Sequence, residues 1–230
     1  MPGLLSIVVP VFNEHGTIGA VVSRLLTIAL PLDREIIVVN DGSTDGTREV
    51  LDALPRDGRV SIVHLSKNSG KGHAVRVGLK ASRGTVTAIQ DADLELDPAQ
   101  LVDLIGPIVA GEADAVYGSR FLNPSAPVPL LTRGGNAFLT WLTNLIFWTS
   151  LTDMETCYKI MRGEVARSLK LSANRFEIEP EITARLLLGR HRIIERPVAF
   201  NPRSRTAGKK IRWHDGFDAI RVLLRLRFGG

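Results

Sequence analysis

Asp91 and Asp93 are the residues whose types and spacing most clearly indicate chemistry, because they directly follow an apolar, strand-forming run, 86–90. Alternate side chains of an extended segment point the same way, so these two carboxylates, together with Glu95, can converge on one hard cation. Carboxylate oxygens suit Mg²⁺ and Mn²⁺, and such an ion would neutralise charge on a diphosphate. Alternatively, the acids only decorate a loop before the helix that Asp97 and Pro98 start.

Two further polar loops carry candidate ligand-binding residues. Asp41 follows the run EIIVVN, and its carboxylate can accept hydrogen bonds from a ribose or a base edge, although the sequence DGSTDG also favours an Asx-type turn. Lys71 lies in the glycine-rich run NSGKG, which is not a Walker A loop because Gly72 stands where Ser or Thr is required. No G-x-G-x-x-G follows the first strand-forming run either, so P-loop hydrolysis and hydride transfer are both disfavoured.

Near-continuous apolar runs alternate with helical patterns along the first half of the chain. Strands are predicted over 4–11, 35–40, 60–65 and 86–90, with helices starting near 18, 47, 73 and 98. In the second half we predict a strand over 115–118, helices over 136–149 and 178–188, and an extended segment over 192–200. This alternation predicts an α/β fold with a mostly parallel, Rossmann-like sheet and helices on both faces. The polar loops above all fall at the carboxyl ends of strands, where such sheets bind ligands.

Composition sets the class of protein and its compartment. With 230 residues, 44% hydrophobic and 23% charged, the chain is typical of one globular domain, 1–212, followed by a small basic amphipathic tail, 213–230. The one cysteine, Cys157, excludes a disulfide framework, and the N-terminal apolar run lacks the basic flank of a signal peptide. We therefore expect a cytoplasmic protein.

Positive charge is concentrated near the C-terminus. The net charge is +5, yet residues 196–230 hold nine Lys and Arg against two Asp, whereas the preceding residues hold 20 basic against 22 acidic. This asymmetry indicates a phosphate-bearing partner, which is a nucleotide, a lipid head group or nucleic acid. A non-enzymatic nucleic-acid binder would interleave aromatic and basic residues along a groove, and only Trp213 and Phe217 come close to that pattern. We expect no nucleic-acid partner.

Six motifs occur in order along the chain: SIVVPVFNE, EIIVVNDGSTDGT, LSKNSGKGHAVRVGL, QDADLELDP, DAVYGSRF and TDMETCYKIMR. Together they resemble the family 2 inverting glycosyltransferases over roughly residues 4–212, and are most similar to the dolichyl-phosphate or polyprenyl-phosphate hexosyltransferase branch. The resemblance implies a GT-A fold and a nucleotide-diphospho-sugar donor. The chain departs from it at Glu95, where the mannosyltransferases typically read DADLQ, and at the run DMETCY from Asp153, where many relatives read D-x-x-S-G-F.

The same resemblance implies roles for single residues, which fall into three sets. The donor-binding set is Pro10, Phe12, Glu14, Asp41, Lys71, Asp91, Ala92, Arg203 and Lys209. The metal set, for Mg²⁺ or Mn²⁺, is the pair Asp91 and Asp93, to which the spacing of the acids, and not the resemblance, adds Glu95. The catalytic set is Asp93, Arg120, Arg133 and Asp153. Its two arginines are expected near the phosphates, while Arg203 and Lys209 are expected to close a basic loop over the donor.

Two segments place apolar residues on one helical face beside basic or polar ones. The first is Phe138, Trp141, Leu142, Leu145 and Trp148, and the second is Phe217, Ile220, Leu223, Leu224 and Phe228 with intervening arginines. Tryptophans on an amphipathic helix suit a membrane interface. Core packing or a dimer contact is the alternative for the first segment, and a solvated helix or one docked on a partner protein is the alternative for the second.

These inferences predict an inverting glycosyltransferase that moves a hexose from a UDP- or GDP-sugar to a polyprenyl or dolichyl phosphate at the cytoplasmic face of a membrane. The acceptor phosphate is already anionic, so catalysis would depend on positioning and on stabilising the leaving diphosphate. Transfer to a sugar hydroxyl is the alternative, and it would need a base such as Asp153 or Glu155. A separate membrane-anchor protein and a homo-oligomer are further candidate partners.

Overall fold

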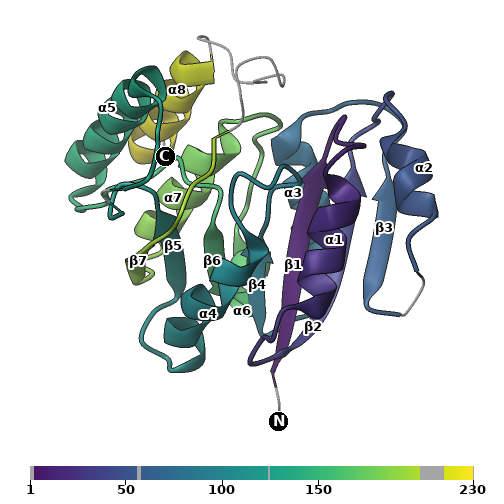
Figure 1. The fold of residues 1–230 in the computed structure, drawn as a ribbon. Helices are drawn as coiled ribbons and strands as arrows, with labels where there is room; N and C mark the ends of the chain where they lie inside the picture. Colours follow the sequence, from purple (N-terminus) through teal and green to yellow (C-terminus); the bar gives the residue numbers. More distant parts are fainter. Residues whose placement is uncertain (1–2, 56–57, 124, 203–214, 230) are drawn as a thin grey trace.

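A seven-stranded sheet forms the centre of the molecule in the computed structural model, which describes residues 3–55, 58–123, 125–202 and 215–229 (Figure 1). The strands are β1 (Leu4–Val11), β2 (Asp33–Asn40), β3 (Val60–His64), β4 (Val86–Ile89), β5 (Ala115–Ser119), β6 (Lys159–Arg162) and β7 (Ile193–Pro197). Their order is β3-β2-β1-β4-β6-β5-β7. Strand β6 runs antiparallel to β4 and β5, and the other pairs are parallel, so the expected mostly parallel sheet is confirmed.

Helices connect the strands and cover both faces of this sheet. They are α1 (Ile18–Thr27), α2 (Thr47–Asp52), α3 (Lys71–Ala81), α4 (Leu101–Val109), α5 (Leu130–Phe147), α6 (Gly163–Ser168), α7 (Ile178–Leu188) and α8 (Asp215–Phe228), with a 3-10 turn, η1 (Pro98–Gln100). As the sequence predicts, Asp97 caps this turn, accepting a hydrogen bond from the backbone N–H of Ala99 at 2.9 Å.

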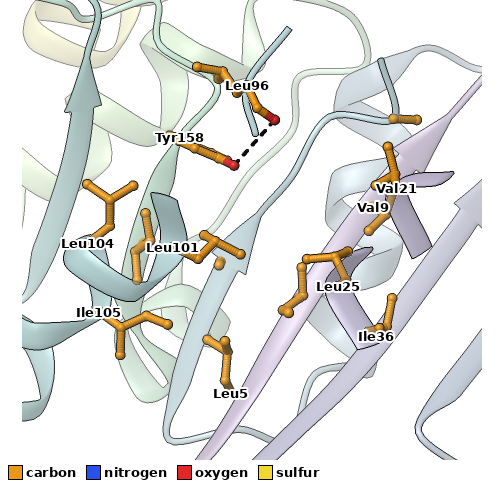
Figure 2. Close-up of a cluster of buried hydrophobic side chains, with 14 of the residues drawn as sticks. Leu5, Val9, Val21, Leu25, Ile36, Leu96, Leu101, Leu104, Ile105 and Tyr158 are labelled. Carbon is orange, nitrogen blue, oxygen red and sulfur yellow. Dashed lines mark hydrogen bonds between the residues drawn. The ribbon is translucent and has the colours of Figure 1, made fainter. Parts of the chain in front are cut away.

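The alternation of side chains along β1 divides the core into two layers. Leu5 and Val9 point into a cluster that includes residues of α1 and α4, which Figure 2 shows in close-up. Val8 points to the opposite side, into a cluster that includes residues of α3 and α7. A strand that is buried on both faces is apolar almost throughout, which explains the uninterrupted run LLSIVVPV.

The structure differs from the sequence-based expectation mainly in the second half. Strand β6 was not predicted, because a four-residue run that opens with Lys159 has no strand periodicity of its own. Helix α5 begins at Leu130 rather than near 136, and the extended segment 192–200 contributes the shorter strand β7. Helix α8, from the predicted tail 213–230, packs against α5 and α7 and buries Ala219 and Leu223, so it is an integral part of the folded unit.

Gly78 allows α3 to lie directly against the central strand. A Cβ at this position would overlap the Cγ1 atom of Val8 on β1, whereas a Cβ at the exposed Gly134, in α5, would meet nothing within 4 Å. Adding a methyl group at these two glycines should therefore have opposite effects on stability, although both lie inside helices.

We expect Gly78→Ala to lower the free energy of unfolding by about 1–3 kcal/mol, because the added methyl overpacks the contact between α3 and β1. Gly134→Ala should leave stability unchanged or raise it by up to about 1 kcal/mol, because alanine is the better helix former. Urea unfolding of both variants measures the difference. Equal destabilisation by the two substitutions would contradict the close approach of α3 to β1.

Candidate active site

Polar residues gather where β1, β2 and β4 end, because parallel strands present their carboxyl ends at one edge of the sheet. Phe12 and Glu14 follow β1, Asp41 follows β2 and Asp91 follows β4 within two residues. Pro10, by contrast, is buried within β1 opposite Val39. Phe12, Glu14, Asp41 and Asp91 therefore lie at one edge, with Pro10 beneath it in the sheet.

The side chain of Asp41 is hydrogen-bonded to the loop that precedes α3. Its two carboxylate oxygens accept hydrogen bonds from the backbone N–H groups of Ser69 (2.8 Å) and Gly70 (2.7 Å). Gly70 has φ +100 and lies so close to the backbone of Asn174 that no side chain fits there. Burial raises the pKa of Asp41, and the two backbone hydrogen bonds oppose that rise. Both oxygens of Asp41 thus hold the loop at residues 69 and 70, and its expected contact with a ribose or a base edge stays a prediction.

Glu14 is also hydrogen-bonded to neighbouring residues. The hydroxyl of Thr17 donates to its carboxylate at 2.9 Å, and its backbone N–H donates to the hydroxyl of Thr47 at 2.9 Å. These bonds join the loop after β1 to the start of α2, so the two loops expected to hold the base and ribose form one connected surface.

A chain of alternating charges extends from the end of β4 into the core. The Nζ atom of Lys71 lies 2.9 Å from Oδ1 of Asp91 and 3.0 Å from Oε1 of Glu179. The other oxygen of Glu179 lies 2.6 Å from Nζ of Lys159, which is fully buried and also donates to the carbonyl of Met154 at 3.0 Å. Lys71 therefore sits between two carboxylates, one at the site and one beneath it.

Burial and ion pairing have opposite effects on the pKa values of these paired residues. Burial is the largest single influence and would raise the pKa of Asp91, but the charge of Lys71 and the hydrogen bonds from Cys157 and Lys71 together outweigh it, so this pKa lies below its ordinary value. Burial would lower the pKa of Lys71, but Asp91, Cys157 and Glu179 together raise it well above its ordinary value. Both groups are thus held in their charged forms.

The sequence did not single out Glu179 or Lys159. Glu179 lies in the first turn of α7 and Lys159 opens β6, so neither is near Lys71 along the chain. The available signal was an acid-rich run, EIEPEI, inside an otherwise apolar helix, which is unusual for a buried element.

The three expected metal ligands are not gathered into one cluster. Within the described residues, no group of three or more His, Cys, Asp and Glu side chains is arranged to hold a metal ion. An oxygen of Asp93 accepts the backbone N–H of Glu95 at 3.1 Å, and Asp91 is paired with Lys71. The expectation that Glu95 is a third protein ligand is therefore not supported. Two carboxylates at alternate positions still fit Mg²⁺ or Mn²⁺, because Mg²⁺ often takes one or two carboxylates and completes its shell with phosphate oxygens and water.

Arg120 is fixed in place by Asp153. The guanidinium donates to both carboxylate oxygens at 2.8 Å each, and the Arg120 backbone N–H adds a third bond at 3.0 Å. Asn136 of α5 donates to the same carboxylate at 2.6 Å. Both charged residues are buried, Asp153 completely. Arg133 is exposed on α5, with its guanidinium 6.0 Å from the centre of the Phe121 ring.

These contacts change the interpretation of Asp153. A carboxylate that is fully buried and accepts four hydrogen bonds cannot readily take a proton from a substrate, so it positions Arg120 rather than acting as a base. Two backbone N–H groups, of Thr152 and Asp153, donate to Glu195 of β7 at 2.8 and 3.0 Å, and this holds the segment against the sheet. Glu195 and Asn136 are positioning residues that the sequence did not reveal.

Glu155 is a carboxylate near this site with a buried oxygen, Oε1, that accepts no hydrogen bond from the described residues. Burial raises its pKa to about 7, with Glu179 and Asp153 adding to the rise and Lys159 and Arg120 opposing it. A carboxyl group with this pKa can exchange a proton near neutral pH.

The remaining predicted residues are placed as follows. Ala92 is buried between the two aspartates. Arg203 and Lys209 lie outside the described residues, so their expected role in a closing loop stays a prediction. The charges of Asp91, Lys71, Glu179 and Arg120 all act on the half-buried thiol of Cys157, which indicates that the β4 end, the α3 start and the Arg120 region adjoin one another.

The family described as Glycosyl transferase family 2 matches residues 6–168, well over half of the chain. The chain belongs to glycosyl transferase family 2. The dodecaprenyl-phosphate galacturonate synthase of Rhizobium johnstonii is 30% identical to this family 2 chain over 181 residues, which cover 73% of the chain and 50% of that protein. The dolichol-phosphate mannosyltransferase of Pyrococcus furiosus is 28% identical over 229 residues, covering 96% and 63%. The chain thus spans between half and two thirds of these relatives.

Solved structures confirm the GT-A-type fold of this family 2 chain. The glucosyl-3-phosphoglycerate synthase of Mycobacterium tuberculosis, crystallised with Mg²⁺ and uridine diphosphate, superposes with a TM-score of 0.75 at 20% identity, covering 98% of this chain and 79% of that one. The same synthase with Mn²⁺, uridine diphosphate and glucosyl-3-phosphoglycerate gives a TM-score of 0.74 at 20% identity, covering 98% and 80%.

The raised pKa of Glu155 predicts a pH-dependent loss of stability. Between its ordinary value of 4.5 and about 7, the folded state holds a proton that the unfolded chain releases, so the free energy of unfolding falls as the pH rises through this window. The loss is at most about 3 kcal/mol. We expect Glu155→Gln to abolish it, whereas Glu164→Gln, at an exposed position on α6, should behave like the wild type.

Urea unfolding at pH 5 and pH 8 tests this. A difference in stability between the wild type and Glu155→Gln that stays constant between the two pH values would contradict the raised pKa.

Proposed function

We propose that this chain transfers a hexose from a UDP- or GDP-linked sugar to a polyprenyl phosphate, with inversion at the transferred carbon. The observation that carries the proposal is the arrangement at the sheet edge. Lys71 is paired with Asp91 at 2.9 Å, Asp93 lies two residues further, and Arg120 is held rigidly by Asp153. A half-buried lysine paired with one of two carboxylates, and a buried arginine in the same region, suit a diphosphate that arrives with a divalent ion.

Asp91 and Asp93 would hold Mg²⁺ or Mn²⁺. When bound, the ion would supply positive charge to the leaving diphosphate. Fold neighbours crystallised with Mg²⁺ or Mn²⁺ and uridine diphosphate support this choice of donor and metal. Lys71 is paired with Asp91 and would therefore lie beside the same phosphates. The loop that Asp41 holds would bind the nucleoside.

The acceptor is argued from its chemistry and from relatives. A polyprenyl phosphate brings its own anionic nucleophile, so the site needs to orient it and to exclude water rather than to deprotonate it. The commitment of Asp153 to Arg120 agrees with a site of this kind, because it leaves a fixed guanidinium and no strong base in that position. The names of the Rhizobium and Pyrococcus relatives, which refer to dodecaprenyl and dolichol phosphates, support the same acceptor class.

Transfer to a sugar hydroxyl is the second candidate, and Glu155 is the observation that favours it. A hydroxyl acceptor needs a base, and Glu155 has a buried, unpartnered oxygen and a pKa of about 7. The two candidates differ in their dependence on this residue: Glu155→Gln should remove most transfer to a hydroxyl and little of the transfer to a phosphate.

The proposed acceptor is a lipid, so we place the enzyme at the cytoplasmic face of a membrane as a peripheral protein. In the described part of the chain, none of the helices has both the length and the apolar character needed to span a bilayer. A separate membrane-anchor protein, a homo-oligomer and a basic loop closed by Arg203 and Lys209 remain parts of the proposal.

Asp93→Asn tests the metal and donor assignment. We expect the substitution to weaken Mn²⁺-dependent binding of UDP-glucose or GDP-mannose roughly tenfold or more, because the ion loses a charged ligand, while the melting temperature changes little. Titration calorimetry with and without Mn²⁺ measures this. Asp103→Asn, at an exposed position on α4, is the matched control and should bind as the wild type does. Unchanged donor affinity in Asp93→Asn would refute the assignment.

A further inference from the structure

Helix α5 has its polar and apolar sides reversed relative to an ordinary surface helix. Its exposed residues include Phe138 (52% exposed), Trp141 (57%), Leu145 (60%) and Trp148 (88%), which we call the outer stripe. Their spacing of three and four residues places them along one side of the helix. Isolated exposed apolar residues are common, but a continuous stripe with two tryptophans marks a contact surface.

The inner side of α5 explains why the apolar residues face outward. Asn136, Thr140 and Thr143 are buried, and each is hydrogen-bonded. Asn136 donates to Asp153 at 2.6 Å, Thr140 donates to the side chain of Asn136 at 2.9 Å, and Thr143 donates to the carbonyl of Leu139 at 2.8 Å. The sequence left core packing open for this segment, but these contacts assign the protein interior to the polar side.

Trp148 supports a use for the stripe outside the protein. It is the C-cap of α5, with φ 56 and ψ 50, a left-handed conformation in which helices usually place glycine. Tryptophan there carries a conformational cost that glycine would avoid, and its indole is almost fully exposed. No contact within the described fold accounts for this residue.

Helix α8 extends the same surface and supplies positive charge. It packs against α5, and the two helices lie side by side in Figure 1. Its exposed residues include Phe217, Leu224 and Phe228, whose spacing of seven and four residues places them on one side of the helix, together with Arg221 and Arg227. Helix α5 itself contains no acidic residue. An apolar, aromatic surface flanked by arginines is complementary to anionic head groups above an acyl layer.

We propose that the outer stripe of α5, with the exposed side of α8, is the surface by which this protein binds an anionic lipid bilayer. The helices lie in the interface, with the indole rings at head-group depth and the arginines beside lipid phosphates. A second copy of the chain would also cover apolar area, but it would place the arginines of α8 near one another, which disfavours it.

This docking has a consequence for catalysis that rests on the proposed function. The inner side of α5 holds Asp153 through Asn136, and Asp153 holds Arg120. Two side chains, Asn136 and Asp153, therefore connect the helix that carries the lipid-facing surface to the guanidinium proposed to bind phosphate. A polyprenyl phosphate can then present its head group to the site while its chain stays in the bilayer.

Flotation with phosphatidylglycerol–phosphatidylcholine vesicles tests the docking surface. We expect the double variant Trp141→Gln with Leu145→Gln to bind roughly tenfold more weakly or worse, because two apolar side chains leave the interface. The matched control, Val109→Gln with Leu188→Gln, changes exposed apolar residues on α4 and α7 and should float like the wild type. Trp148→Gly should also lose vesicle binding while raising the melting temperature, because glycine suits the left-handed cap.

The proposal would be overturned if both stripe variants floated with vesicles as well as the wild type does. It would also be overturned if sedimentation showed that the wild type is a dimer and that the stripe variants are monomers. Donor titration in the absence of vesicles separates this result from the proposed function. Stripe variants that lose vesicle binding but keep wild-type donor affinity support docking, whereas a wild type that floats but binds no nucleotide sugar refutes the proposed function alone.

Discussion

The need to neutralise buried charge beside the open edge of the sheet governs this structure. An unpaired charge in a protein interior costs several kcal/mol. Asp91 and Lys71 are nevertheless half-buried here, and Glu179 and Lys159 are buried. Each is paired with the next, so the end of β4, the start of α3, helix α7 and strand β6 are held together by one chain of ion pairs. The geometry of the site and the packing beneath it therefore cannot vary independently.

A second buried carboxylate organises the other side of the site in the same way. Asp153 holds Arg120 and receives Asn136, while Glu195 holds the backbone on either side of the Thr152–Asp153 peptide bond. In both networks a carboxylate fixes a cation instead of reacting itself. This arrangement suits catalysis by positioning and electrostatic stabilisation, in which prearranged charges need no reorganisation during the reaction. It also connects the site to α5, whose polar side faces the protein.

Pairing has a further consequence for the proposed donor. The cation nearest to Asp91 is already balanced by two carboxylates, so a diphosphate arriving alone would add negative charge to a neutralised cluster. A divalent ion arriving with it supplies the missing positive charge. The proposed requirement for a metal thus follows from the charge balance of these ion pairs as well as from the carboxylates that would bind the metal.

The sequence by itself determined the parts of the molecule that depend on local pattern. The four N-terminal strands, the helices between them and the Asp97 cap could be predicted because each depends on neighbouring residues, and the loops that follow β1, β2 and β4 were correctly expected at one edge. Only the tertiary structure decided the rest. Strand β6 exists because β4 and β5 flank it, and Glu179 matters because folding brings it between Lys71 and Lys159. Asp153, expected as a base, is saturated by partners distant in sequence, and the apolar stripe of α5 was equally consistent with a core until its polar side was seen to be buried. Periodicity shows that a helix has two sides, but the partners that satisfy its polar groups decide which side faces the protein.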